Sequence, residues 1–228
     1  MNHFTAAVQL TQPFEFRSYE GREFAEALVQ IPAYKDGEDP IQLKMISWKS
    51  DSIKKAPPAV GQWLLVEGGI KVSAFERDGV KQKVASISAD TITPIGGQIK
   101  LNRIALVGNA GYDAEVKYFE SGKVKGGFTM AVRRPVKNSD PDWFDIELWD
   151  KPAQVAGDYV LKGSQVGIVG SLRIEHWQDR NTGAPRSKPI INATGLHLLG
   201  SKQQQTTAPP QNQGWGSTEQ RLQSGVVF

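Results

Sequence analysis

The chain has 228 residues, of which 39% are hydrophobic and none is cysteine, so two domains with separate cores are possible but disulfides and thiolate metal sites are not. No apolar run reaches the roughly 18 residues of a membrane-spanning helix, and the N-terminus lacks the basic start and apolar block of a signal peptide, so the cytoplasm is the expected location. The net charge is +3, and residues 98–200 hold 14 basic and 11 acidic side chains, against 11 and 12 in residues 1–97. A polyanionic ligand is therefore expected on residues 98–200.

Three segments of the first hundred residues recur later in the chain in the same order. ISWK at 46–49 resembles ELWD at 147–150, GQWLLVEG at 61–68 resembles GSQVGIVG at 163–170, and ADTITPIG at 89–96 resembles ATGLHLLG at 193–200. The offset drifts only from 101 to 104 residues. Because the three matches keep their order, we predict two copies of one fold, over residues 1–97 and 98–200.

The first copy carries the fainter version of the pattern. Alternation places Lys44 and Trp48 on one strand face, and Lys71 and Phe75 on another. The segment that should form its helix, residues 52–58, ends in two prolines and is disfavoured for a regular helix. The assignment of the first copy to the same fold therefore depends on the internal repeat alone.

Strand signals dominate the second copy. Apolar runs and alternation predict five strands, at residues 103–107, 124–132, 142–149, 165–177 and 190–199. A short helix over residues 152–161, closed by Gly163, separates the third strand from the fourth. This is the order of a five-stranded oligonucleotide-binding (OB) barrel, and glycines in the fourth strand suit its sharp bends. The predicted fold class is all-β, with two tandem OB-fold barrels.

Alternation along these strands separates a core face from an exposed one. The residues expected in the core are Phe128, Met130, Val132, Phe144, Ile146, Leu148, Val166, Ile168, Leu172 and Ile174. The outward positions include Trp143 and Trp149 on the third strand, and Arg173 and Trp177 on the fourth. Flat aromatic surfaces flanked by cations suit stacked bases and a phosphate backbone. The alternative is that these tryptophans are buried against a loop or another subunit.

The second copy resembles the bacterial single-stranded DNA-binding protein family over residues 101–200. The matching text is NRIALVG at 102–108, DAEVKY at 113–118, SGK at 121–123, Trp143, AQVAGDYVLKGSQV at 153–166 and WQD at 177–179. The resemblance implies that Trp143, Trp149 and Trp177 stack on bases and that basic residues on the same face contact phosphates. The family often has a further tryptophan after the second strand, where this chain has Arg133 and Arg134.

The expected function is therefore sequence-tolerant binding of single-stranded DNA in replication, recombination or repair, at the nucleoid. The candidates for DNA contact in the second copy are Trp143, Trp149, Trp177, Arg103, Arg133, Arg134, Lys137, Arg173, Arg180, Arg186 and Lys188. In the first copy they are Trp48, Phe75, Lys44 and Lys71, for which direct contact and structural support stay equally open. An RNA-binding or accessory OB-fold interaction protein is the alternative, because stacking tolerates both sugars.

An enzyme is not expected from this sequence, and neither a cofactor nor a metal. The three histidines, His3, His176 and His197, have no metal-ligand spacing, and the glycine-rich segments lack a phosphate-loop pattern. Asp145 and Glu147 lie two apart on an exposed face, where hydrogen bonding or the tuning of a cationic face is favoured over acid–base catalysis.

Residues 201–228 are rich in Gln and Pro without periodicity, so a disordered tail is expected. The resemblance implies that Phe228, at the tip, binds replication or repair proteins. Family members carry several acidic residues before that tip, whereas Glu219 is the only one here, so weak or altered recruitment is expected. The resemblance also implies a homodimer, because two barrels per chain then give the four that the family typically uses.

Overall fold

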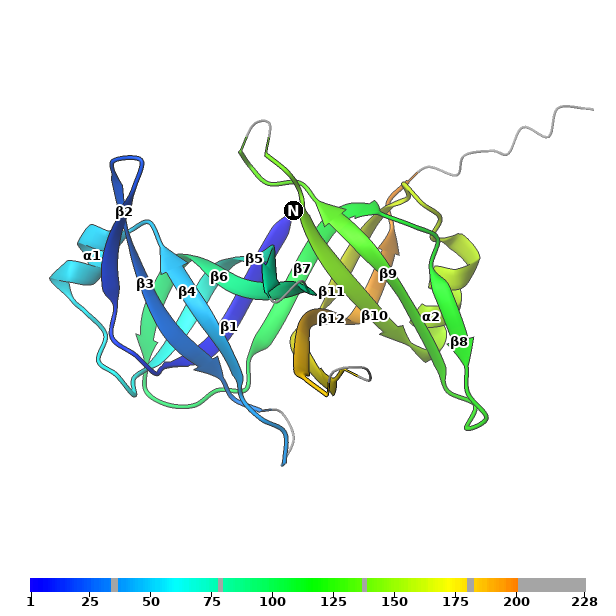
Figure 1. Cartoon of the computed structure of the whole chain (residues 1–228), viewed down its shortest axis with the longest axis horizontal. Coiled ribbons are helices and arrows are strands. Elements are labelled where there is room, and N and C mark those ends of the chain that lie inside the picture. The colour runs from blue at the N-terminus through cyan, green and yellow to red at the C-terminus, as the bar shows by residue number, and fades with distance from the viewer. Residues whose placement is uncertain (34–36, 78–79, 137–138, 180–182, 201–228) are drawn as a thin grey trace, which may run out of the picture.

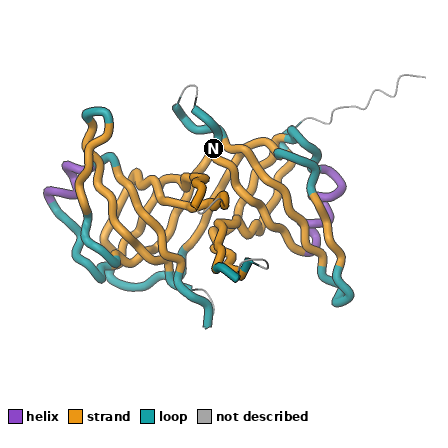
Figure 2. Tube along the Cα trace, viewed as in Figure 1, coloured by secondary structure: helices purple, strands orange, loops and turns teal. Residues whose placement is uncertain are grey.

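The computed structural model describes residues 1–33, 37–77, 80–136, 139–179 and 183–200. The first half forms β1 (Asn2–Leu10), β2 (Glu15–Tyr19), β3 (Arg22–Ile31), β4 (Ile41–Ser47), α1 (Ser50–Lys55), β5 (Trp63–Arg77) and β6 (Val80–Ile95). The second half forms β7 (Asn102–Ala110), β8 (Glu115–Tyr118), β9 (Val124–Val132), β10 (Asp142–Trp149), α2 (Asp150–Tyr159), β11 (Gln165–Gln178) and β12 (Pro185–Leu198). Figure 1 shows two barrels side by side, and Figure 2 shows strands dominating both, with the helices at opposite outer ends.

The two halves have the same strand order. The strands follow one another as β2-β3-β4-β6-β5-β1 in the first half and β8-β9-β10-β12-β11-β7 in the second. A β1–β3 pairing and the equivalent β7–β9 pairing close each barrel. The predicted internal repeat and the two OB-fold barrels are therefore confirmed.

The bounds of the strands and of the helix follow the sequence predictions closely in the second half. The strands predicted at 124–132 and 142–149 match β9 and β10, and the helix predicted at 152–161 begins two residues earlier, at Asp150. In the second half, the short strand β8 was not predicted, and for the first half no strand bounds were predicted. The prolines disfavour a helix over 52–58 as expected, but six residues ahead of them still form α1, which ends at Lys55, before Pro57.

The barrels are joined edge to edge by an antiparallel pairing of β1 with β7. Phe4 lies opposite Ile104 at the centre of this pairing, with Asn2 opposite Leu106 and Ala6 opposite Asn102 at its ends. Phe4 and Ile104 occupy equivalent positions in the two barrels, since they pair with Gly68 and Gly170 respectively. The halves are therefore related by an approximate two-fold axis between these residues, and one sheet runs through both.

Buried apolar side chains fill both barrels and form one connected cluster. The largest fully buried side chains include Phe4, Met45 and Ile87 in the first half, and Phe128 and Phe144 in the second. Every residue predicted for the core of the second half is buried except Ile174, which is half-buried where β11 leaves the barrel. Burying such a side chain contributes about 1.5–3 kcal/mol, so these alternating positions hold the strands in register.

A glycine in the fourth strand of each barrel lets a long hairpin leave the barrel wall. The register of β5 with β6 shifts at Gly68, and that of β11 with β12 shifts at Gly170. A Cβ atom at either glycine would collide with a backbone oxygen across the bulge, of Ser88 or of Asn192. Beyond the bulge, β5 no longer pairs with β1 and β11 no longer pairs with β7, so each continues with one partner only.

Candidate nucleic-acid interface

The outward positions of β9, β10, β12 and β11 form one face of the second barrel, which we call the tryptophan face. Trp143 and Trp149 lie at the two ends of β10, and Trp177 lies on the β11–β12 hairpin opposite Arg186. Trp143 is 44% exposed and Trp177 43%, whereas Trp149 is half-buried. The alternation in the sequence therefore predicted the orientation of all three indoles.

Trp149 is held by contacts on several sides. Its ring stacks on that of Phe119, with centroids 6.2 Å apart and planes inclined by 21°. The ammonium of Lys125 lies 5.5 Å from the ring centroid, within the range of a cation–π contact. The indole Nε1–H donates a hydrogen bond of 2.9 Å to Oε1 of Glu147. The indole is thus oriented before any ligand arrives.

Trp143 and Trp177 are less enclosed. The backbone of Gly111 passes close to the Trp143 ring, since a Cβ at Gly111 would lie 2.7 Å from it and 2.6 Å from the hydroxyl of Thr129. The ammonium of Lys188 lies 5.9 Å from the centroid of the Trp177 ring. Both indoles present a free ring surface next to a small or cationic neighbour, which is the arrangement that suits a stacked base.

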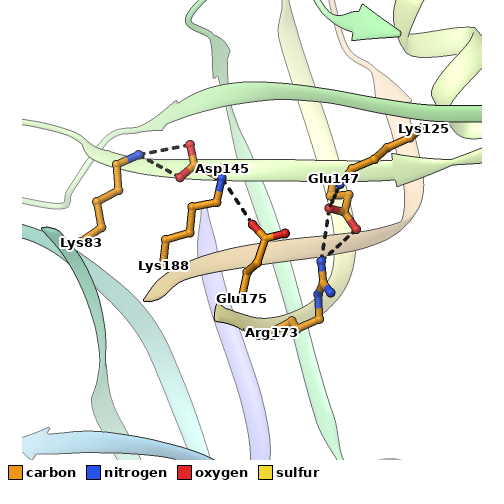
Figure 3. A network of polar contacts seen from close by, with 7 residues as sticks. All are labelled: Lys83, Lys125, Asp145, Glu147, Arg173, Glu175 and Lys188. Atoms are coloured by element: carbon orange, nitrogen blue, oxygen red, sulfur yellow. Dashed lines mark hydrogen bonds and ion pairs between the residues drawn. The ribbon is translucent and has the colours of Figure 1, made fainter. Parts of the chain in front are cut away.

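Carboxylates bind most of the cations on the tryptophan face, as Figure 3 shows. The Glu147 side chain, only 7% exposed, accepts hydrogen bonds from Lys125 at 2.7 Å and from Arg173 at 3.0 and 3.2 Å. Lys188 lies 3.5 Å from Glu175. Burial alone would raise the pKa of Glu147, but the hydrogen bonds from Lys125 and Trp149 and the charge of Arg173 outweigh it and hold the pKa below its ordinary value.

A shallow hollow of about 320 Å³ lies between β8 and the tryptophan face. Its floor includes Gly127, Phe128 and Ile190, and its rim carries Lys117, Lys125 and Lys188 together with several carboxylates. Tyr112 also lines it, and burial, with the nearby carboxylates of Glu115 and Asp145, raises the pKa of this phenol. The charge around the hollow is therefore mixed, with lysines and carboxylates side by side.

The structure brings only some of the predicted cations to this face. Lys188 and Arg173 lie on it, and Arg186 lies beside Trp177 but is only 11% exposed and 3.6 Å from Asp179. Arg134 is bound to Asp142 at 2.7 and 2.9 Å, and Arg133 is exposed just after β9. Lys137, Arg180 and Phe228 lie outside the described residues.

Arg103 stands apart from the tryptophan face. It projects from β7 opposite Thr5 of β1, at the joint between the barrels. The alternation within one strand indicates that Arg103 points outward, but it does not say which side of a closed barrel that strand forms.

The first barrel carries a smaller aromatic cluster at the equivalent place. Trp48 is exposed, with the Phe24 ring centroid 5.2 Å from its own and the Arg22 guanidinium 5.0 Å away. Phe75 is exposed on the β5–β6 hairpin, and Lys71 is exposed on the same strand. Lys44 lies 3.2 Å from the buried carboxylate of Glu26. Trp48 and Lys44 thus have partners within the first barrel, and whether these four residues contact DNA stays a prediction.

Phe119, Lys125 and Lys83 contact residues of this face but were not among the predicted site residues. Phe119 follows β8 in a segment without periodicity, so nothing in the sequence indicated that it supports Trp149. Alternation in the second strand predicts that Lys125 points outward, but it does not indicate that the ammonium lies over the Trp149 ring. Lys83 belongs to the first barrel and reaches the tryptophan face only through the joint between the barrels.

Among the described residues, no group of three or more His, Cys, Asp or Glu side chains could hold a metal ion. No helix within that same part of the chain is long and apolar enough to cross a membrane.

Comparisons with known proteins give similarities over the second half and over the whole fold. Residues 101–199 match the model of the single-strand binding protein family. The chain is 55% identical to single-stranded DNA-binding protein 1 of Synechocystis sp. over 116 residues, which are 50% of this chain and 96% of that protein. It is 57% identical over 102 residues to the single-stranded DNA-binding protein of Thermosynechococcus vestitus, covering 45% of this chain and 85% of the relative.

Solved structures extend the similarity to the first half. The wild-type single-stranded DNA-binding protein of Thermus aquaticus superposes with a TM-score of 0.66 over 99% of this chain and 97% of that one, at 20% identity. A deletion mutant of the same protein gives a TM-score of 0.68 over 92% and 98%, at 21% identity. At these identities the likeness shows the fold, which is shared along both barrels.

Proposed function

The chain belongs to the single-strand binding protein family, and from this we propose that it binds single-stranded DNA across the tryptophan face of its second barrel. The observation that carries the proposal is the convergence of Trp143, Trp149 and Trp177 on one face with lysine and arginine side chains beside them. Proteins of this family are non-enzymatic DNA-binding proteins, in agreement with the expectation that the chain is not an enzyme.

The proposed mechanism is base stacking combined with phosphate contact. Each base that stacks on an exposed indole contributes about 1–3 kcal/mol, and this term does not depend on sequence because every base has a π face. Lys125, Arg173 and Lys188 supply positive charge beside the indoles, and Glu147 holds the first two in position. Coating of transient single strands in replication, recombination or repair is the role that such sequence-tolerant binding serves.

The direct test is titration with a single-stranded oligonucleotide. We expect DNA to quench tryptophan emission, and the affinity to fall with salt at a log–log slope of about −0.7 for each phosphate neutralised. Trp177→Ala should weaken binding by about 1–3 kcal/mol, the value of a single base stack. Phe75→Ala should cost less, since the first barrel has no excess of positive charge.

Tyr159→Ala is the matched control, because Tyr159 is an exposed aromatic residue on α2, outside the tryptophan face. A folded Trp177→Ala variant that bound DNA like the parent would overturn the proposal. A greater loss from Phe75→Ala would reverse the ranking of the two barrels. An RNA oligonucleotide of the same sequence and length tests the alternative ligand.

A further inference from the structure

The β5–β6 hairpin of the first barrel reaches across the joint and touches β10 of the second. The ammonium of Lys83, on β6, lies 2.9 and 3.1 Å from the two carboxylate oxygens of Asp145. The backbone N–H of Val72, on β5, donates a hydrogen bond of 3.1 Å to Oδ1 of Asp142. Both acceptors lie on β10, on either side of Trp143, and Figure 3 shows Lys83 entering the polar network from outside the second barrel.

The two acceptors hold the hairpin in different ways. Asp142 is buried, and Arg134 binds both of its oxygens, so the hydrogen bond to Val72 is made inside a fixed arrangement. The Lys83–Asp145 pair is partly open to solvent, with side chains 33% and 22% exposed. The buried contact can therefore position the hairpin without the exposed pair, which leaves the Lys83 ammonium available to another anion.

The contact is not a consequence of the approximate two-fold symmetry, because the reciprocal residues cannot make it. The positions equivalent to Asp142 and Asp145 in the first barrel hold Ile41 and Lys44. The position equivalent to Lys83 on the other hairpin holds Ser187. Only the hairpin of the first barrel carries a cation that meets a carboxylate on the other barrel at these positions.

We propose that Lys83 is a phosphate-binding residue which the first barrel contributes to the tryptophan face, and that Asp145 holds its ammonium in place until a single-stranded DNA phosphate replaces the carboxylate. The inference rests on the proposed function, and it extends the surface used by DNA across the joint. Asp145 lies two residues from Trp143 along β10, so an ammonium there stands beside the position of a stacked base. A lysine suits this exchange, since its ammonium forms a point contact with either kind of anion.

The test compares Lys83→Gln, Asp145→Asn and a control, Lys55→Gln, in the full chain. Lys55→Gln removes the same charge on α1, which Figure 1 places at the far end of the first barrel. Affinity for an oligothymidylate is measured at several salt concentrations, and urea unfolding verifies that each variant is folded. Removing the neutralisation of a single phosphate at about 0.1 M salt corresponds to about fivefold in affinity and about 0.7 in the salt slope.

We expect Lys83→Gln to lower both the affinity and the salt slope by these amounts, and Asp145→Asn to raise the affinity, because it releases the ammonium without removing it. The control should change neither. A pair that only braces the joint would give weaker binding in both variants, or no change in either, and each of these results would overturn the inference while the parent still binds DNA. A parent chain that bound no DNA would overturn the proposed function and this inference with it.

Discussion

The carboxylate of Glu147 accepts hydrogen bonds from side chains on three different strands. Lys125 belongs to β9, Trp149 to β10 and Arg173 to β11, and all three reach the same almost fully buried side chain. Removing a buried acceptor leaves its partners without compensation, which costs more than the net contribution of one hydrogen bond. Glu147 therefore positions both an indole and two cations of the tryptophan face, although the residue itself is hidden from any ligand.

We predict that Glu147→Gln lowers the free energy of unfolding at neutral pH by about 1–3 kcal/mol, because the amide can still accept from Trp149 but no longer pairs with two cations. Urea unfolding of parent and variant measures the difference.

The same difference should depend on pH. The pKa of Glu147 is lower in the folded chain than its ordinary value of 4.5, so the ionised carboxylate stabilises the fold above that value. This contribution is lost as the pH falls below 4.5 through the folded pKa. The unfolding free energies of parent and variant should therefore become similar only at acid pH. An equal difference at neutral and acid pH would show that the charge of Glu147 does not stabilise the fold.

Gly111 controls the position of Trp143. We predict that Gly111→Ala displaces the indole, because the added methyl group would lie 2.7 Å from the ring, and that DNA binding weakens by up to one stack, about 1–3 kcal/mol. Near-ultraviolet circular dichroism reports the displacement, and an oligonucleotide titration reports the affinity. Gly97→Ala serves as the control, since a Cβ there meets no atom within 4 Å. Unchanged binding in a variant with a displaced indole would remove Trp143 from the contact surface.

On the tryptophan face, the sequence predicted which side chains point outward but not which residues they contact. Alternation was sufficient to place Trp143, Trp149 and Trp177 outward, because orientation depends on the period of a strand and on nothing further along the chain. Which carboxylate each cation meets depends on the register between strands. Arg134 was predicted to track phosphates, but the structure pairs it with Asp142, eight residues further along the chain.

An asparagine side chain fixes the backbone where each long hairpin leaves its barrel. The amide of Asn102 donates to the Leu172 carbonyl at 2.8 Å and accepts from the Leu172 N–H at 3.0 Å. The amide of Asn2 makes the equivalent pair of bonds to Ile70, at 2.7 and 3.1 Å. The side chain thus replaces the strand partner that the hairpin loses at the bulge, and both copies of the fold use the same solution.

We predict that Asn102→Leu destabilises the chain by about 2–4 kcal/mol, since it leaves a buried N–H and a buried C=O of Leu172 without partners. Asn2→Leu should cost less, because its two bonds are only part-buried. Thermal unfolding of the two variants shows which substitution destabilises the chain more. If Asn2→Leu lowered the stability more than Asn102→Leu, the loss of stability would not follow the burial of the two hydrogen bonds.

The order of the elements was accessible from the sequence, whereas the short edge strands were not. Strands such as β9 and β10 have one buried face, so their alternation is visible in the residues. By contrast, every residue of β2 is exposed, and three of the four in β8 are. Such strands bury too little to leave a periodic signal, and they form only because β3 and β9 offer a free edge.

The joint between the barrels depends on strands that are about a hundred residues apart in the chain, so no local pattern could predict it. The repeat predicted that the halves are alike, but the way they meet depends on the register of β1 with β7. The structure also shows where the likeness ends. Lys83, Asp142 and Asp145 link the halves in one direction only, so we propose residues 1–97 and 98–200 as two domains that act as one binding body.

In the part of the chain that the structure describes, no helix covers a large part of the central sheet. Among the described residues, α1 packs against β3, and α2 packs against β8, β9, β10 and β12, so neither helix covers the outer side of β5, β1, β7 and β11. The half-buried outward residues there include Leu65, Ala105, Val107 and Val169. A second copy related by a two-fold axis would cover the same surface on both chains, as a closed homodimer requires.

We therefore predict a homodimer, in which two chains with two barrels each bring four barrels together. Light scattering should give the mass of two chains, and Ala105→Glu should reduce it to that of one, because a charge on each subunit would be buried at the two-fold contact without a partner. Gln42→Glu adds the same charge on β4, away from this surface, and should leave the dimer intact. A mass of one chain or of four for the parent would contradict the prediction, and a dimeric Ala105→Glu variant would move the contact to another face of the molecule.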